Sequence, residues 1–155
     1  KYSYFSSKAR KEGYVQISDI FAETSGNERE HAKLWFKFLN DGDVPDTKTN
    51  LLEAANGEYS EWTDMYKRFA EEAKEEGFTQ IATLFSLVAG VEKEHAKRYR
   101  QILEHLEQGV TFERDGVTLW KCLNCGYIHH GSSAPTVCPV CAHAQAYFVE
   151  FADNY

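Results

Sequence analysis

Two pairs of metal-ligand side chains occur in this chain at the same helical spacing. Glu28 and His31 form a Glu-x-x-His tetrapeptide, and Glu92 and His95 repeat it 64 positions later. On a helix, residues three apart lie about 60° apart around the axis, so each pair projects to one side. A carboxylate and an imidazole on one face suit iron or manganese. The spacing therefore predicts a metal site.

The two tetrapeptides belong to an internal repeat. When residues 11–39 are aligned with residues 75–103, 12 of 29 positions are identical, whereas average composition gives roughly two by chance. The pair Tyr2 and Tyr66 extends the repeat upstream. We interpret each copy as a helical hairpin.

Two further carboxylates favour two metal ions over one. Glu58 and Glu61 repeat the three-residue spacing on an apolar stripe between the two tetrapeptides. Carboxylates gathered in an apolar bundle repel one another and require cations. A single Glu-x-x-His on an exposed helix usually occurs by chance. Two copies in register within a repeat favour a metal site instead. One Glu from each of two helices plus Glu-x-x-His from two others is the di-iron carboxylate pattern.

Helices must position these side chains, because apolar residues recur at helical spacing up to about residue 108. Gly13 and Gly77 indicate the turn within each hairpin, and turn residues at 40–50 link the hairpins. We expect four helices: a first ending near Glu12, then 14–40, 50–76 and 78–108. This order predicts a mainly α fold with a ferritin-like four-helix bundle, a variety that has one long crossover.

A second module follows the bundle. We place the domains at 1–108 and 109–155, because the helical period disappears after Gly109 and short loops and strands are expected. Its cysteines are spaced to close a tetrathiolate metal site: Cys122, Cys125, Cys138 and Cys141. Spacing leaves structural zinc and redox-active iron both open. An iron would supply electrons to a di-iron site, so the context favours iron.

Composition excludes several function classes. The net charge is −7, with Lys and Arg scattered along the chain, which argues against nucleic acid or an anionic membrane as partner. No apolar run reaches the roughly 18 residues of a membrane-spanning helix. Paired CxxC motifs are typical of a metal site in an intracellular protein, so we expect a cytoplasmic location.

The motifs together resemble the rubrerythrin family. They are Glu28-x-x-His31, Glu58-x-x-Glu61, Glu92-x-x-His95, Cys-Leu-Asn-Cys-Gly-Tyr and Cys-Pro-Val-Cys-Ala-His, and the resemblance covers essentially the whole chain. It implies a di-iron bundle followed by a rubredoxin-like domain with one iron on four cysteines. It also implies a peroxidase that reduces hydrogen peroxide to water, protects against oxidative stress, and draws electrons ultimately from NADH through a reductase or rubredoxin.

The resemblance also implies a role for each ligand. Glu28 and Glu92 look like the carboxylates that bridge the irons. Glu58 and His95 resemble ligands of one iron, while Glu61 and His31 resemble alternating ligands of the other. Tyr2 and Tyr66 match tyrosines that hydrogen-bond the carboxylates. Subunits of the family pair head to tail, so we expect a homodimer or higher homo-oligomer.

The chain departs from the family pattern at one ligand. The family has a further Glu on its first helix, and the repeat places the counterpart of Glu58 several residues before Lys1. We therefore expect the polypeptide to continue upstream of Lys1.

Two other functions stay open at this stage. One is a ferroxidase or iron-handling protein whose cysteine module holds structural zinc. The other is a metal-stabilised electron carrier or interaction protein without catalysis. Metal analysis and peroxide turnover would separate these from the peroxidase.

Overall fold

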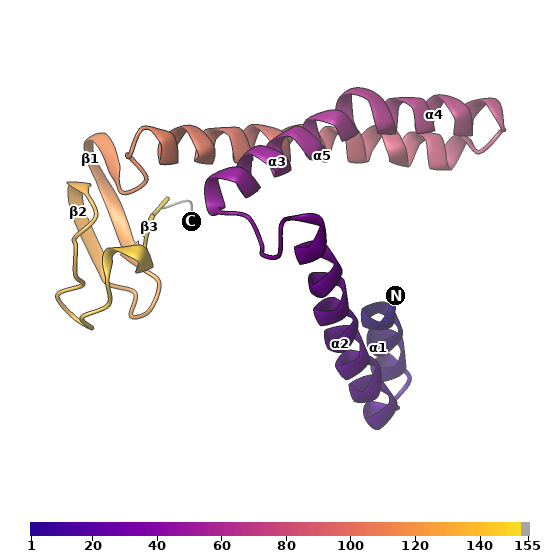
Figure 1. The fold of residues 1–155 in the computed structure, drawn as a ribbon, viewed down its shortest axis with the longest axis horizontal. Helices are drawn as coiled ribbons and strands as arrows, with labels where there is room; N and C mark the ends of the chain where they lie inside the picture. Colours follow the sequence, from indigo (N-terminus) through magenta and orange to yellow (C-terminus); the bar gives the residue numbers. More distant parts are fainter. Residues whose placement is uncertain (153–155) are drawn as a thin grey trace. The chain divides into compact units, whose positions relative to one another are not determined.

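The computed structural model describes residues 1–152. Helices come first and a small sheet follows (Figure 1). The elements are α1 (Tyr2–Lys11), α2 (Val15–Leu39), α3 (Thr47–Ser60), a π-helical segment (Glu61–Met65), α4 (Tyr66–Glu75), α5 (Thr79–Glu107), β1 (Glu113–Cys122), β2 (Ile128–Ser133), a 3-10 turn (Gln145–Tyr147) and β3 (Phe148–Glu150). None of the described helices combines the length and the apolar character that crossing a bilayer requires.

The four expected helices are confirmed, with ends within about three residues of the prediction. The third is α3, the π-helical segment and α4 in succession, 47–75. The chain divides into two compact units, 1–46 and 47–152 of the described residues. These units are defined by contacts within the chain and do not test the predicted domain boundary at 108/109, which stays a prediction. Residues 153–155 of the second predicted domain lie outside the described residues.

The first unit is a helical hairpin of α1 and α2. Gly13 closes it with φ of 87°, a left-handed conformation that glycine adopts without steric cost. The N–H of Tyr14 donates to the carbonyl of Ala9 at 2.9 Å and so satisfies the end of α1. The Oγ atoms of Ser6 and Ser18 lie 3.0 Å apart between the two helices.

The helices of the second unit repeat this hairpin. In Figure 1, α3 and α4 run alongside α5. Gly77, with φ of 86°, closes the α4–α5 turn, and the Phe78 N–H donates to the Ala73 carbonyl at 2.7 Å. Both glycines that the sequence indicated as breaks are therefore confirmed.

The same aromatic cluster packs inside each hairpin. In the first, the Phe5 and Phe21 ring centroids are 5.6 Å apart; in the second, the equivalent Phe69 and Phe85 centroids are 5.5 Å apart. Tyr2 stacks on Phe21 at 6.3 Å, and Tyr66 lies 6.0 Å from Phe85. The sequence repeat is thus also a repeat of packing.

The sheet module has strand order β2-β1-β3, and both strand pairs are antiparallel. Its buried core is small: Trp120, Cys122, Ala134, Cys138 and Phe148. Two of these five residues are metal-ligand cysteines, so apolar burial alone leaves the module marginal, and a bound metal would supply much of its folding free energy.

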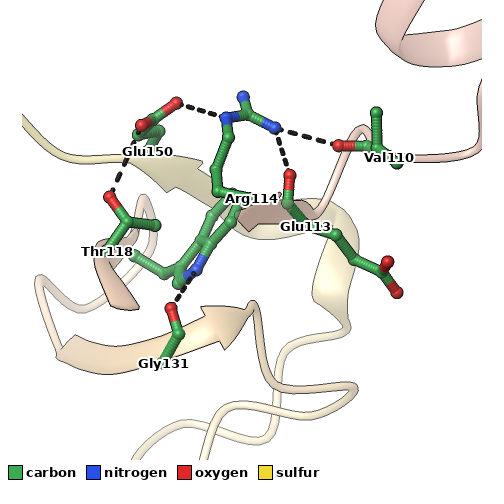
Figure 2. A network of polar contacts seen from close by, with 7 residues as sticks. Val110, Glu113, Arg114, Thr118, Gly131 and Glu150 are labelled. Carbon is green, nitrogen blue, oxygen red and sulfur yellow. Dashed lines mark hydrogen bonds and ion pairs between the residues drawn. The ribbon is translucent and has the colours of Figure 1, made fainter. Parts of the chain in front are cut away.

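Arg114 ties the start of the sheet to its last strand (Figure 2). Its Nε donates to Glu150 at 2.8 Å, and its Nη1 donates to the Val110 carbonyl at 2.9 Å. The guanidinium also lies 5.4 Å from the Trp120 ring centroid. One side chain therefore connects the residues after α5 to β1 and β3.

Candidate metal centres

Glu58, Glu92 and His95 meet between α3 and α5. One ligand atom from each lies within 4.8 Å of the others. The Nδ1 atom of His95 is 2.7 Å from Glu92 Oε2 and 3.6 Å from Glu58 Oε2. The Glu92 side chain is only 13% exposed and that of Glu58 22%. Two carboxylates and an imidazole thus lie together in one partly desolvated site.

Small residues let the two helices bring these ligands together. Ala55, one turn before Glu58, is fully buried, and Ala96, one turn after Glu92, is 4% exposed. A methyl side chain at each contact allows close approach of the helix axes. The three-residue spacing of Glu92 and His95 then places both on the side that faces Glu58.

The cluster is electrostatically incomplete without a cation. Burial, and then a hydrogen bond with Glu92, raise the pKa of Glu58 above its usual range. Two adjacent carboxylates share a proton in this way when nothing else offsets their repulsion. A divalent or trivalent ion would take the place of that proton. The carboxylate and imidazole donors therefore fit the iron expected from the sequence.

Tyr66 and Glu61 belong to the surroundings of this cluster. Burial, and then the negative charges of Glu92, Glu61 and Glu58, raise the pKa of the Tyr66 phenol. Glu61 begins the π-helical segment and Tyr66 begins α4 immediately after it. Single π-turns inside α-helices often occur at functional sites. Sequence reasoning missed this segment.

Glu28 and His31 lie on α2, in the first unit. The Nδ1 atom of His31 is 3.4 Å from Glu28 Oε2, and both side chains are more than half exposed. The predicted inward orientation of this pair stays a prediction, because these exposures describe the first unit by itself. The pair keeps its predicted one-sided geometry on α2.

The four cysteines form the second centre, as predicted. Their Sγ atoms lie within 4.8 Å of one another, with Cys122 to Cys141 and Cys125 to Cys138 each at 3.7 Å. Cys122 and Cys138 are buried. This arrangement fits a tetrahedral ion bound by four thiolates.

The thiols of this centre titrate very differently without a metal. A hydrogen bond from the His143 backbone N–H lowers the pKa of Cys141 to about 6. At Cys125 the Tyr127 backbone N–H acts in the same direction, but burial and hydrogen bonds with the other thiols outweigh it and raise the pKa to about 12. A bound cation would remove this difference by favouring thiolate at every position.

Known family models match both the helical part of the chain and the cysteine module. A family model described as Rubrerythrin matches residues 1–103 and, in a second match, residues 49–119. The chain belongs to the rubrerythrin family. A model described as the rubredoxin-like domain of rubrerythrin matches residues 120–149. In this rubrerythrin the Glu58, Glu92 and His95 cluster is the di-iron site candidate, and the four cysteines are the rubredoxin-like site.

Similar proteins cover the whole chain. Rubrerythrin-1 of Clostridium acetobutylicum is 50% identical over 100% of this chain and 87% of its own length. Rubrerythrin of Nitratidesulfovibrio vulgaris is 46% identical over 96% of this chain and 83% of its own. Among solved structures, the partially reduced state of nigerythrin is 29% identical and covers 97% of this chain and 77% of that chain, with a TM-score of 0.41.

Proposed function

We propose that this rubrerythrin is a non-haem di-iron peroxidase that reduces hydrogen peroxide to water and protects against oxidative stress. One observation carries the proposal: the Glu58, Glu92 and His95 cluster and the four-cysteine centre both form within residues 47–152. A pair of metals with carboxylate ligands, in one chain with a one-electron carrier, is suited to reducing a small oxidant and being reduced again. The expected donor is an NADH-linked reductase or a rubredoxin.

The reaction consumes two electrons and two protons for each peroxide, and yields two waters. When bound, two ferrous ions supply both electrons at once, so the O–O bond is cleaved without release of a radical. The protein must hold the ions, keep bulk water away from them and provide the protons.

We assign the ligands by the family pattern. Glu28 and Glu92 would hold both ions, Glu58 and His95 would be ligands of one ion, and Glu61 and His31 would be alternating ligands of the other. The partial burial of Glu92 and Glu58 supports this assignment, because a desolvated carboxylate binds a cation more strongly than a solvated one.

Tyr66 and its repeat partner Tyr2 are proposed to hydrogen-bond the carboxylates and hold protons. A phenol is protonated at neutral pH, and the raised pKa of Tyr66 makes loss of this proton still harder, so the phenol is available as a donor to a carboxylate oxygen.

Two rival functions make different predictions. A ferroxidase would use the bundle metals and needs only structural zinc at the cysteines. A non-catalytic carrier would hold metals without consuming peroxide. The peroxidase needs iron at both centres, and we expect it to act in the cytoplasm as a homodimer.

Peroxide consumption by iron-loaded protein supplied with NADH and a reductase tests the proposal. We expect turnover that stops when Glu92 is replaced by Ala, although the cysteine iron still becomes reduced. Wild-type protein that carries three irons per chain yet consumes no peroxide would contradict it.

A further inference from the structure

A cavity lies between α5 and the neighbouring helix that contains α3 and the π-helical segment, within the second unit. Its volume is about 560 Å³, and small-molecule sites have volumes of roughly 300–1,000 Å³. The buried methyl group of Ala96 forms part of its wall. The rest of the lining consists of Tyr59 and Trp62 on one side and five polar or charged residues of α5 on the other. None of these residues is a proposed metal ligand.

Each aromatic ring of the cavity faces a cation of α5. The Lys93 Nζ atom is 5.5 Å from the Trp62 ring centroid, and the Arg100 guanidinium carbon is 5.7 Å from the Tyr59 ring centroid. The two rings meet edge to face, with centroids 5.5 Å apart. Attraction between a cation and a ring face holds the long side chains beside the rings. The cavity therefore has one aromatic side and one cationic side.

The cations of this cavity are offset by carboxylates less than those of the first repeat copy. On α2, Lys33 Nζ is 2.9 Å from Glu30 Oε2. The equivalent pair on α5, Lys97 and Glu94, is 3.9 Å apart. Arg100, where the first copy has an apolar residue, contacts a ring and an amide rather than a carboxylate within the described residues. Positive charge thus remains for an anionic ligand.

One end of the cavity combines a ring with hydrogen-bonding groups. Arg100 Nη2 donates to Asn56 Oδ1 at 3.2 Å, which fixes the guanidinium beside Tyr59. A guanidinium has several N–H donors, so this bond leaves others for a ligand. Gln101 and Glu104 line the same end. The amide can donate and accept, and the carboxylate accepts from an amino group.

The other end of the cavity is suited to a phosphate. Lys93 and Lys97 are four residues apart on α5, so their side chains lie on one face of the helix. Ammonium groups of this kind bind phosphate as point charges. The lining carboxylate, Glu104, lies about 16 Å from Lys93 along the helix axis, at 1.5 Å per residue. A phosphate near the lysines therefore avoids most of its repulsion.

We propose that this cavity binds a purine nucleotide. The base stacks on Tyr59 beside the Arg100 guanidinium, with its polar edge toward Gln101, and the phosphate is bound by Lys93 and Lys97. Guanidinium planes stack on aromatic rings, and amide side chains form hydrogen bonds with the edge of adenine. Lys93 and Arg100 are about 10 Å apart along the axis, so the two ends hold different parts of one ligand. The inference does not depend on the proposed peroxidase function.

Calorimetric titration of the iron-loaded protein with AMP at low salt tests the site. We expect saturable binding that becomes about tenfold weaker in both Lys97→Ala and Arg100→Ala, since each loses a charged contact with the ligand. Arg98→Ala is the matched control, because Arg98 lies on α5 outside the cavity lining, and it should bind AMP like the wild type. Helical circular dichroism and the colour of the cysteine iron verify folding of each variant.

Two results of this titration would overturn the proposal. One is wild-type protein that shows no saturable binding of AMP at millimolar concentration. The other is an equal loss of affinity in R98A and R100A, which would show attraction to the general charge of α5 rather than binding in the cavity.

The separate parts of the nucleotide test its two ends. Adenosine and inorganic phosphate should each bind more weakly than AMP, because each occupies one end of the cavity. Phosphate that binds as tightly as AMP would overturn the nucleotide site and leave a simple anion site. Adenosine that binds as tightly as AMP would overturn the role of the two lysines.

Photolabelling with an azido-substituted AMP locates the bound base. We expect the labelled peptides to contain Tyr59 or residues 100–104, and excess AMP should prevent the labelling. Labelling confined to other peptides would contradict the placement of the base in this cavity.

Discussion

On α5, the Nδ1 atom of His95 lies 2.7 Å from a carboxylate oxygen of Glu92, whereas in the repeated pair on α2 the corresponding distance from His31 to Glu28 is 3.4 Å. The α5 pair is also the less exposed of the two. Glu58 also approaches His95 from α3, with Oε2 3.6 Å from Nδ1. A third potential ligand therefore accompanies the α5 pair within the second unit.

Replacing Glu92 by Ala should remove bundle iron and leave the cysteine iron in place. The variant loses the least exposed carboxylate of the cluster, which is proposed as a ligand of both ions. Metal analysis should fall from about three irons per chain to about one, the cysteine iron. Glu94→Ala is the matched control, because the Glu94 side chain is 65% exposed. Loss of both metal centres together in E92A would contradict the independence of the two sites.

The contribution of Glu58 to the stability of the metal-free protein should decrease as pH rises past about 4.3, the ordinary pKa of Glu. Because the pKa of Glu58 is raised in the folded state, folded protein retains this proton where the unfolded chain has lost it. The contribution is complete below the unfolded pKa and disappears as pH passes the folded value.

Glu58→Gln isolates this effect. At neutral pH the metal-free variant should have a higher unfolding free energy than the metal-free wild type. The expected difference is on the order of 1 kcal/mol, a common interaction energy between residues in contact. The advantage should vanish near pH 4. Chemical denaturation at several pH values measures the difference. A pH-independent difference would show that ionisation of the partly buried Glu58 beside Glu92 is not its cause.

Replacing Cys138 by Ser should unfold the sheet module without unfolding the helices. Cys138 is 1% exposed, and metal binding in small modules of this type contributes about 10–16 kcal/mol. Far-ultraviolet circular dichroism should keep its helical signal while the ferric tetrathiolate colour disappears. Val140→Ser, at a 67% exposed position between two ligands, should keep the colour. Retained colour in C138S would contradict the four-thiolate assignment.

Arg114→Ala should loosen the junction between α5 and the sheet. The variant loses the bonds to Glu150 and to the Val110 carbonyl, and hydrogen bonds to charged groups contribute about 1.5–3 kcal/mol. Amide exchange in β3 should accelerate about tenfold or more. Arg114→Lys should recover little of this protection, because Lys lacks the planar fork of donors. Unchanged exchange in R114A would show that the sheet is held by its core alone.

Much of the architecture could be predicted from the sequence because its signals are local. Gly13 and Gly77 indicated the turns, and the period of apolar residues indicated the helices. The four cysteines were predicted to meet because each CxxC pair closes by itself around an ion.

The π-helical segment and Arg114 could not be predicted, because neither has a local signal. Glu61–Met65 lies within a longer stretch of apolar residues at helical spacing, and its wider turn is seen only in the backbone of the structure. The role of Arg114 depends on its hydrogen bond to Glu150, which lies 36 positions later in the sequence.

Reaction of the reduced, iron-loaded protein with a limiting amount of hydrogen peroxide tests the central proposal most directly. We predict that wild-type protein consumes peroxide with two electrons for each molecule, and that E92A protein, which retains the cysteine iron, does not consume it. Equal rates of peroxide loss in the two proteins would contradict the assignment of the reaction to the Glu58, Glu92 and His95 centre.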